Sequence, residues 1–163
     1  MIDMKILKQL NKDGAQNRLD ALEYIAKDFN FRAPDKRYVN NHIHSTYSFS
    51  PYSPTAVAFA AKEAGLATAG IVDHDSIGGA REFLKAGKIV GIPTTIGMEC
   101  RVSMAGTKFE KTRTNNPDQL GISYMTIHGV PHGKIDELQE YFSPLREERN
   151  LRNRQIIVNI NRL

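Results

Sequence analysis

Two histidines in the first third of the chain, His42 and His44, are separated by a single residue. On an extended strand, side chains two residues apart point to the same face, so the two imidazoles would lie side by side. Two imidazoles on one face make half of a binding site for a transition metal. The alternative is a pair of surface histidines on an edge strand, and other metal-binding side chains must decide between the two interpretations.

The segment Asp73-His74-Asp75 places a third imidazole between two carboxylates. Either carboxylate could orient His74 as a metal ligand through a hydrogen bond to its ring. Alternatively, Asp75 or Ser76 caps a helix that begins near residue 77. The two roles are compatible, so we expect His74 to be a ligand and a neighbouring side chain to be the cap.

Two more candidate ligands follow apolar runs. Glu99 ends one such run, and a buried carboxylate needs a metal or an ionic partner because an isolated buried charge is costly. Arg101 is the competing ionic partner. His128 ends the next run, and His132 follows four residues later, but a glycine after His128 and a proline before His132 exclude the helical zinc-protease motif. We therefore expect His128 to be a ligand and His132 to lie on a loop surface.

Short apolar runs and helical patterns alternate along the chain and would position these side chains. Strands are predicted at residues 38–42, 67–72, 93–98 and 122–127, and helices at residues 15–29, 54–64, 77–86, 136–142 and 144–163. Such alternation predicts an α/β fold with parallel strands, whose sites lie at the carboxyl ends of the strands. The candidate ligands all fall at such ends. Residues 105–121 are polar, and this long stretch is predicted to form either a substrate-facing loop or a mobile insertion.

Composition and charge exclude several other classes of protein. The chain has 163 residues, a net charge of +4 and one cysteine, Cys100, which cannot form an internal disulfide. It contains neither an apolar run that could span a membrane nor a signal peptide, so we expect a cytoplasmic protein without membrane contact. The arginine-rich segment at residues 145–155 is interpreted as a solvated helix face in preference to a phosphate-binding patch. Motifs for phosphate-binding loops, dinucleotides and serine nucleophiles are absent from the sequence.

The order of these motifs, H-x-H, then D-H-D-S, then G-x-E, then a strand ending in histidine, resembles the PHP superfamily (polymerase and histidinol phosphatase). The matching segments are NNHIHSTYS, GLATAGIVDHDSIGGAREFLKA, IPTTIGMECRV and SYMTIHGV. The resemblance implies the N-terminal portion of a distorted (β/α)7 TIM-like barrel, preceded by an amphipathic helix. Residues 1–37 would be a helical extension and linker, and residues 38–163 a partial barrel domain.

The resemblance also implies two or three divalent metal ions, of manganese, iron or zinc, at the carboxyl ends of the strands. By position, His42 and His44 are similar to ligands of the first metal. Glu99 is similar to the carboxylate that bridges the first and second metals. His128 corresponds to the histidine on the second metal, and His74 to a ligand of the third.

Three carboxylates are implied to be catalytic: Glu99, and the two acidic neighbours of the central histidine, Asp73 and Asp75. One position departs from the family, which often carries an aspartate ligand of the third metal five residues after the second histidine. Phe49 occupies that position here. This departure weighs against a third metal.

The expected function is that of a metal-dependent hydrolase, a phosphoesterase that uses a metal-bridged hydroxide on a phosphate mono- or diester. The partner would be a small phosphorylated substrate or a nucleic-acid end. One alternative is an amidohydrolase-type enzyme that cleaves C–N bonds with the same metals, and another is a non-catalytic binding or structural module. Four βα units do not close a seven-stranded barrel, so we expect the C-terminal part of the barrel to be missing and this chain to be inactive alone. Its exposed apolar edges would favour a homo-oligomer.

Overall fold

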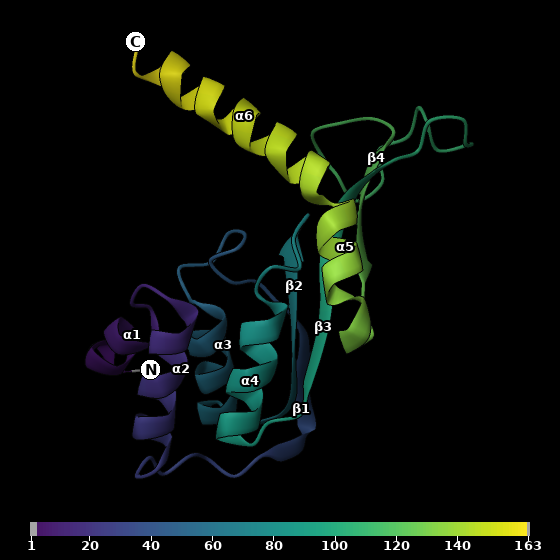
Figure 1. Ribbon diagram of the computed structural model, residues 1–163. Helices are drawn as coiled ribbons and strands as arrows, with labels where there is room; N and C mark the ends of the chain where they lie inside the picture. The colour runs from purple at the N-terminus through teal and green to yellow at the C-terminus, as the bar shows by residue number, and fades with distance from the viewer. Residues whose placement is uncertain (1–2, 163) are drawn as a thin grey trace.

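A computed structural model describes residues 3–162, in which helices cover one face of a four-stranded sheet (Figure 1). The elements in chain order are α1 (Met4–Leu10), α2 (Ala15–Ala26), β1 (Asp35–Ile43), α3 (Pro54–Glu63), β2 (Leu66–His74), α4 (Ala80–Val90), β3 (Thr94–Ser103), β4 (Ile122–Ile127), the 3-10 helix η1 (His132–Lys134), α5 (Ile135–Tyr141) and α6 (Ser143–Ile160). The predicted α/β architecture is therefore confirmed. Among residues 3–162, no helix is both long and apolar enough to cross a membrane.

The strand order in the sheet is β1-β2-β3-β4. β1, β2 and β3 are parallel, as predicted, but β4 runs antiparallel to β3, so the prediction of four parallel strands is wrong at the last one. The physical reason is the connection: parallel neighbours need a crossover, usually a helix, and residues 104–121 contain neither helix nor strand. The predicted long loop at residues 105–121 is thus confirmed, and it turns the chain back on itself.

Two boundaries differ from those predicted, each for a local reason. β3 continues to Ser103, so Glu99 lies within the strand and does not end it. The helix predicted to stop before Gly87 continues to Val90, and Gly87 lies within it at a point where a Cβ atom would collide with the side chain of Thr94. The actual stop is Gly91, whose φ of 67° is the left-handed conformation that glycine favours at helix ends.

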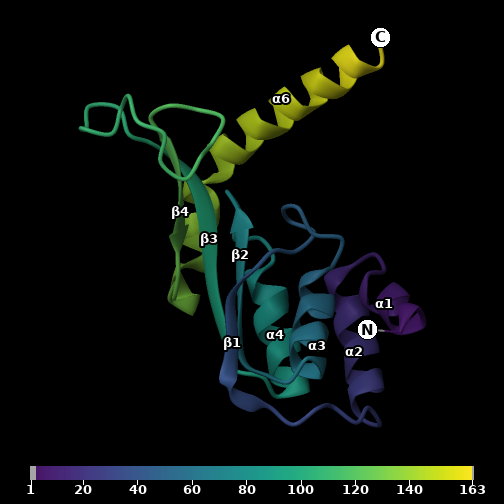
Figure 2. The same ribbon diagram turned by 180° about the vertical axis from the view of Figure 1, so that it is seen from behind.

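The hydrophobic core lies between the sheet and the helices α2, α3 and α4. Phe59 of α3 and Phe83 of α4 are fully buried, and Phe59 packs edge-on against Phe29 and Phe31 from the segment before β1. Ser53 caps α3 by accepting a hydrogen bond from the backbone of the third helical residue, which fixes where that helix begins. Figure 2 shows the opposite face of the sheet, where no helix formed by residues 3–162 covers β1.

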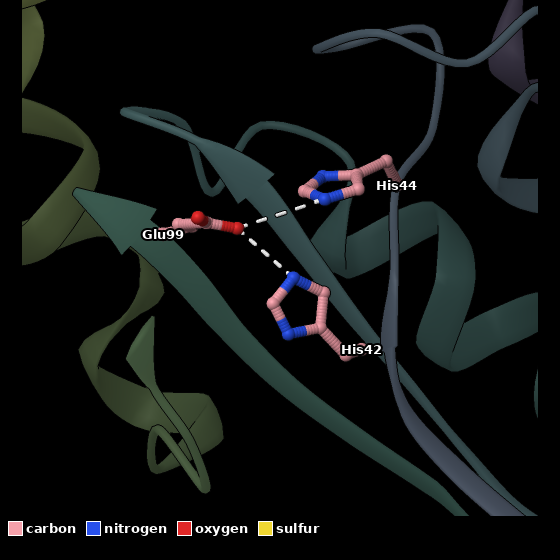
Figure 3. Close-up of side chains that lie close together, drawn as sticks. All are labelled: His42, His44 and Glu99. Atoms are coloured by element: carbon pink, nitrogen blue, oxygen red, sulfur yellow. Dashed lines mark hydrogen bonds and ion pairs between the residues drawn. The ribbon is translucent and has the colours of Figure 1, made fainter. Parts of the chain in front are cut away.

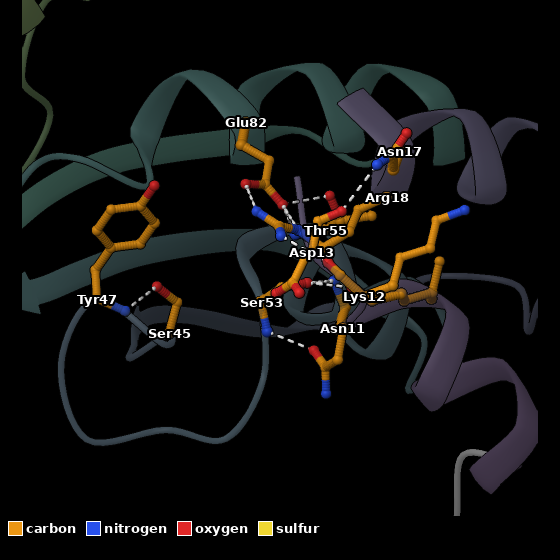
Figure 4. A network of polar contacts seen from close by, with 12 residues as sticks. Asn11, Lys12, Asp13, Asn17, Arg18, Ser45, Tyr47, Ser53, Thr55 and Glu82 are labelled. Carbon is orange, nitrogen blue, oxygen red and sulfur yellow. Dashed lines mark hydrogen bonds and ion pairs between the residues drawn. The ribbon is translucent and has the colours of Figure 1, made fainter. Parts of the chain in front are cut away.

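A buried polar network joins the N-terminal helices to the rest of the molecule (Figure 4). Arg18 of α2 forms two hydrogen bonds with the carboxylate of Glu82 of α4, at 2.7 and 2.9 Å. The same carboxylate accepts hydrogen bonds from the hydroxyl and backbone N–H of Thr55 in α3. The side chain of Asn11 accepts a hydrogen bond from the backbone of Ser53. The amphipathic helix α2 therefore covers α3 and α4.

The last helix, α6, has a different environment from the others. It projects from the sheet near α5 and extends away from the body of the molecule (Figure 1). None of its residues is buried, and apolar side chains such as Leu151 and Ile160 are more than half exposed. One side chain of this helix, Arg149, reaches the end of β2 and is described with the site below.

Candidate metal centre

Three of the predicted ligands converge at one point on the sheet (Figure 3). His42 lies at the end of β1, His44 follows that strand by one residue, and Glu99 lies within β3. The Oε2 atom of Glu99 is 2.9 Å from Nε2 of His42 and 3.6 Å from Nε2 of His44. One ligand atom from each of the three residues falls within 4.8 Å of the others, a spacing that one metal ion could bridge.

His74, at the end of β2, lies against this group. Its ring stacks on the ring of His44 with centroids 4.8 Å apart, and its Nε2 atom is 3.9 Å from Oε2 of Glu99. A single carboxylate oxygen therefore faces three imidazoles. Burial lowers the pKa of His74, which favours the neutral ring that a metal ligand needs.

His128 lies beside the group without belonging to it. Its ring centroid is 6.3 Å from that of His42. Although β4 runs in the unexpected direction, its last residue pairs with Met98, so the chain leaves β4 next to the site. The backbone of Ile127 passes so close to Gly97 that a side chain on Gly97 would collide with it. The glycine of the G-x-E segment thus permits the approach that brings His128 to the site.

The two aspartates beside His74 contact other groups. Asp73 is buried, and its carboxylate accepts hydrogen bonds from the backbone N–H and the hydroxyl of Ser45, at 2.6 and 2.7 Å. Burial raises the pKa of Asp73, and the two bonds from Ser45 oppose that rise. Because Ser45 directly follows His44, Asp73 fixes the turn that carries His44. A contact between Ser48 Oγ and Nδ1 of His44, at 3.1 Å, further fixes that ring.

Asp75 has an unusual backbone and its own partner. Its φ of 51° is in the left-handed region, and its N–H donates to the carbonyl of Glu99 at 2.8 Å. Its carboxylate accepts a hydrogen bond from Arg149 of α6 at 2.7 Å. Among the described residues, neither Asp73 nor Asp75 bonds the ring of His74, so the expected orienting contact is not formed.

The predicted helix cap is also wrong, for a reason that the turn makes clear. The residue that precedes α4 is Gly79, and no side chain caps that helix. Ser76 instead accepts a hydrogen bond from the backbone of Gly78, within the turn between β2 and α4. This turn delays the start of α4 to Ala80, so Asp75 and Ser76 lie too far from the first helical N–H groups.

The groups around Glu99 suit a divalent cation. The competing partner, Arg101, donates to Gln119 and not to Glu99. The Glu99 side chain is 13% exposed, and the imidazoles of His42, His44 and His74 lie within 3.9 Å of its carboxylate oxygen. Neutral imidazoles with one carboxylate form a donor set for zinc, iron or manganese. The side chains therefore fit a metal ion at this point.

At the position where the family resemblance implies an aspartate, Phe49 is 75% exposed and lies beside His74. The two rings meet edge-on with centroids 5.0 Å apart, and the Arg149 guanidinium lies 5.6 Å from the Phe49 ring centroid. An aromatic ring thus takes the place next to His74 that a third metal's carboxylate would need.

Two residues near His74 were missed by reasoning from the sequence. Tyr124 of β4 lies opposite Arg101, and its ring is 5.9 Å from that of His74. Arg149 belongs to the segment that was interpreted as a solvated face. The competing interpretation, a phosphate-binding patch, was the available signal for Arg149, but no signal pointed to Tyr124 because its approach depends on the antiparallel pairing of β4.

Solved structures that resemble this fold include the following two. One is a crystal structure from Bifidobacterium adolescentis of a protein to which a metal-dependent phosphoesterase function is attributed, with a TM-score of 0.57 and 18% identity, covering 80% of this chain and 40% of that one. The other is an amidohydrolase from Chromobacterium violaceum with bound SO4 and no metal, with a TM-score of 0.50 and 26% identity, covering 72% of this chain and 36% of that one. The chain thus spans well under half the length of either protein, and its fold is a partial barrel, as predicted.

The comparison with curated proteins found no match. The PHP domain family, in contrast, matches residues 40–157, a segment that begins just before His42 and includes every candidate ligand. That segment is more than two thirds of the sequence, so the family extends well beyond the local motifs. The chain therefore belongs to the PHP domain family.

Proposed function

We propose that this chain carries the metal centre of a metal-dependent hydrolase that cleaves phosphate esters. The observation that carries the proposal is the convergence of His42, His44 and Glu99 within 4.8 Å. A divalent cation held there would act as a Lewis acid and lower the pKa of a bound water. Membership of the PHP domain family supports the same chemistry.

The residues of the site would have different roles, set by their positions. His42, His44 and Glu99 would hold the cation, and His74 would stand 3.9 Å from the carboxylate oxygen as a further ligand or proton carrier. Asp73 would keep His44 in place through Ser45. Since the imidazoles are neutral when they bind metal, a divalent cation with one carboxylate leaves the centre positively charged, which attracts an anionic ester.

A C–N hydrolase is the second candidate, because one similar structure is named an amidohydrolase. The match to the PHP domain family, and the metal-dependent phosphoesterase function attributed to the other similar structure, favour a phosphate ester over an amide for this chain.

The proposal is tested by metal content and hydrolysis measured on the same preparations. Protein purified without chelator or metal resin, both as this chain and as a longer chain that completes the barrel, is analysed for manganese, iron and zinc. Both preparations are then assayed with p-nitrophenyl phosphate, bis-p-nitrophenyl phosphate and p-nitroacetanilide. The His42→Ala/His44→Ala double variant should lose the metal and at least about 100-fold of the phosphatase rate. His132→Ala is the matched control, since it removes an exposed imidazole outside the site.

Three results would contradict the proposal in different ways. Equal metal content in the double variant and the wild type would show that His42 and His44 do not bind the metal. Hydrolysis of the anilide without hydrolysis of either phosphate would favour the C–N hydrolase. Bound metal without hydrolysis of any substrate, in this chain and in a longer chain that completes the barrel, would favour a non-catalytic module.

A further inference from the structure

A cavity of about 480 Å³ opens beside the metal centre. Its walls come from the end of β2, the β3–β4 pair and the first turns of α6. His74 belongs both to this wall and to the group around Glu99, so the cavity and the centre are adjacent. The volume lies within the range of sites that bind small organic ligands and exceeds the volume that a single water or inorganic ion needs.

One part of the cavity is cationic. Three arginines line it, Arg101 from β3 and Arg149 and Arg152 from α6, against two carboxylates, Asp75 and Glu148. Arg149 and Arg152 are three residues apart on a helix and therefore lie on the same face.

The donors of the two α6 arginines are not all in use. Arg149 bonds Asp75 through one terminal nitrogen, Nη1, and a guanidinium carries five N–H donors. Among residues 3–162, no carboxylate pairs with Arg152. The wall therefore retains donors that can hold an oxyanion.

The other part of the cavity is aromatic. Phe49 and Tyr124 both line it, and their rings meet the ring of His74 at 5.0 and 5.9 Å. Phe49 is mostly exposed although it is large and apolar. Exposed aromatic rings around a concave site offer flat surfaces against which a planar ligand group can stack.

We propose that this cavity binds the organic part of the substrate, a planar ring that carries an oxyanion. Arg149 and Arg152 hold the oxyanion that this organic part carries, a phosphate or a carboxylate, and Phe49 and Tyr124 contact the ring. This assignment rests on the proposed phosphoesterase function and specifies its substrate class as an aromatic or heterocyclic organic phosphate. It also accounts for a phenylalanine next to His74, where a metal-binding carboxylate is otherwise expected.

The test is binding without metal or turnover. Chelator-treated protein is titrated by calorimetry with phenyl phosphate, inorganic phosphate and benzoate. Arg152→Ala should weaken the binding of phenyl phosphate about tenfold, because it removes a charge-assisted pair of hydrogen bonds. Arg154→Ala is the matched control, since it removes the same charge from an exposed position of the same helix that does not line the cavity, and it should change the affinity less than twofold.

A second variant tests the aromatic part. Tyr124→Leu should weaken phenyl phosphate several-fold and leave inorganic phosphate unchanged. Benzoate bound as tightly as phenyl phosphate would identify a carboxylate as an accepted oxyanion, and weaker benzoate binding would identify phosphate. Circular dichroism verifies that α6 keeps its helicity in each variant.

The proposal is overturned if Arg152→Ala and Arg154→Ala weaken binding equally, or if phenyl phosphate does not saturate the protein at millimolar concentration. Either failure leaves the metal content and the hydrolysis assays unaffected. Conversely, the His42→Ala/His44→Ala variant should still bind phenyl phosphate in the absence of metal. The two proposals can thus fail separately.

Discussion

The two faces of the sheet are held in different ways. On the helix side, α2, α3 and α4 bury large side chains such as Phe59 and Phe83 completely, and the side chains of the Arg18–Glu82 pair are only 14% and 5% exposed. On the other side, β1 is exposed along most of its length, and the His42 side chain is 49% exposed. The comparison teaches that stability and chemistry depend on separate sets of residues, so the site should tolerate changes that the helix side cannot.

The largest effect is expected on the helix side. Arg18→Ala would leave the buried Glu82 carboxylate without its cationic partner, which costs about 3–5 kcal/mol of the free energy of unfolding. Urea denaturation followed by circular dichroism measures the loss. A change below about 1 kcal/mol would show that Glu82 is adequately stabilised by Thr55 alone, and the contrast between the two faces would then be weaker than the burial indicates.

Two controls sharpen this prediction. Arg18→Met combined with Glu82→Leu replaces the ion pair by apolar groups and should recover most of the lost stability, since no buried charge remains. The His42→Ala/His44→Ala variant should lower the free energy of unfolding of the metal-free protein by less than about 1 kcal/mol, because neither side chain belongs to the buried core. A larger loss in that variant would break the comparison directly.

Asp73 connects the two faces and should show an intermediate effect. Asp73→Ala removes the acceptor of two buried donors on Ser45, which costs about 1–3 kcal/mol. The loosened turn should also weaken metal binding about 10–100-fold, measured by competition with a chromophoric chelator. Asp28→Ala, at an exposed position, is the control. Unchanged metal affinity in Asp73→Ala would mean that the His44 turn is held by its other contacts.

Phe49→Asp tests the exposed face of the sheet. It should change the free energy of unfolding by less than about 0.5 kcal/mol, because the Phe49 side chain makes few packing contacts. The new carboxylate would lie next to His74, where the aromatic ring lies now. We expect the metal content to rise by up to one ion per chain relative to wild type, measured by elemental analysis. Phe49→Ala, which removes the ring without adding a ligand, should leave the metal content unchanged. Equal metal content in Phe49→Asp and Phe49→Ala would contradict the correspondence of this position with the family aspartate.

The smallest effect concerns Cys100 and needs no substitution. It is a difference in the reactivity of this thiol between the folded and the unfolded protein. Burial raises the pKa of this thiol from 9.0 to about 11, and Asp75 and Glu99 add to the rise. At pH 8 the folded protein should therefore react with iodoacetamide much more slowly than the urea-unfolded chain. Because the folded state holds the proton more tightly, the stability that this group contributes is complete below pH 9 and is lost as the pH rises towards 11. Equal alkylation rates at pH 8 would show that β3 opens readily.

The elements and the central ligands could be predicted because their signals are local. Apolar runs bounded by glycine or proline indicated β2 and β3, and the i, i+2 spacing placed His42 and His44 on one face. Parallel pairing of β1, β2 and β3 then brings three strand segments to one edge, which explains why His74 and Glu99 were expected nearby. The pairing of neighbouring parallel strands was therefore sufficient to predict that these side chains lie close together.

The remainder depends on contacts between distant segments. The direction of β4 is set by a loop whose path no periodicity describes. The partner of Asp75 is Arg149, far along the chain, so the sequence around the D-H-D segment favoured a helix cap instead. The short helix α1 was missed because its few apolar residues make no clear pattern, although its end is fixed by the bond between Asn11 and Ser53.

The identical order of the strands in the sheet and along the chain has a consequence for folding. Each strand pairs with the one synthesised just before it, so each step closes only a short loop and loses little chain entropy. The sheet can therefore grow from the N-terminal end while the ribosome is still extending the chain. His42, His44 and His74 would be positioned first, when β1 and β2 pair. Metal affinity would then arise in one step, when β3 joins the sheet and brings Glu99 next to the three imidazoles.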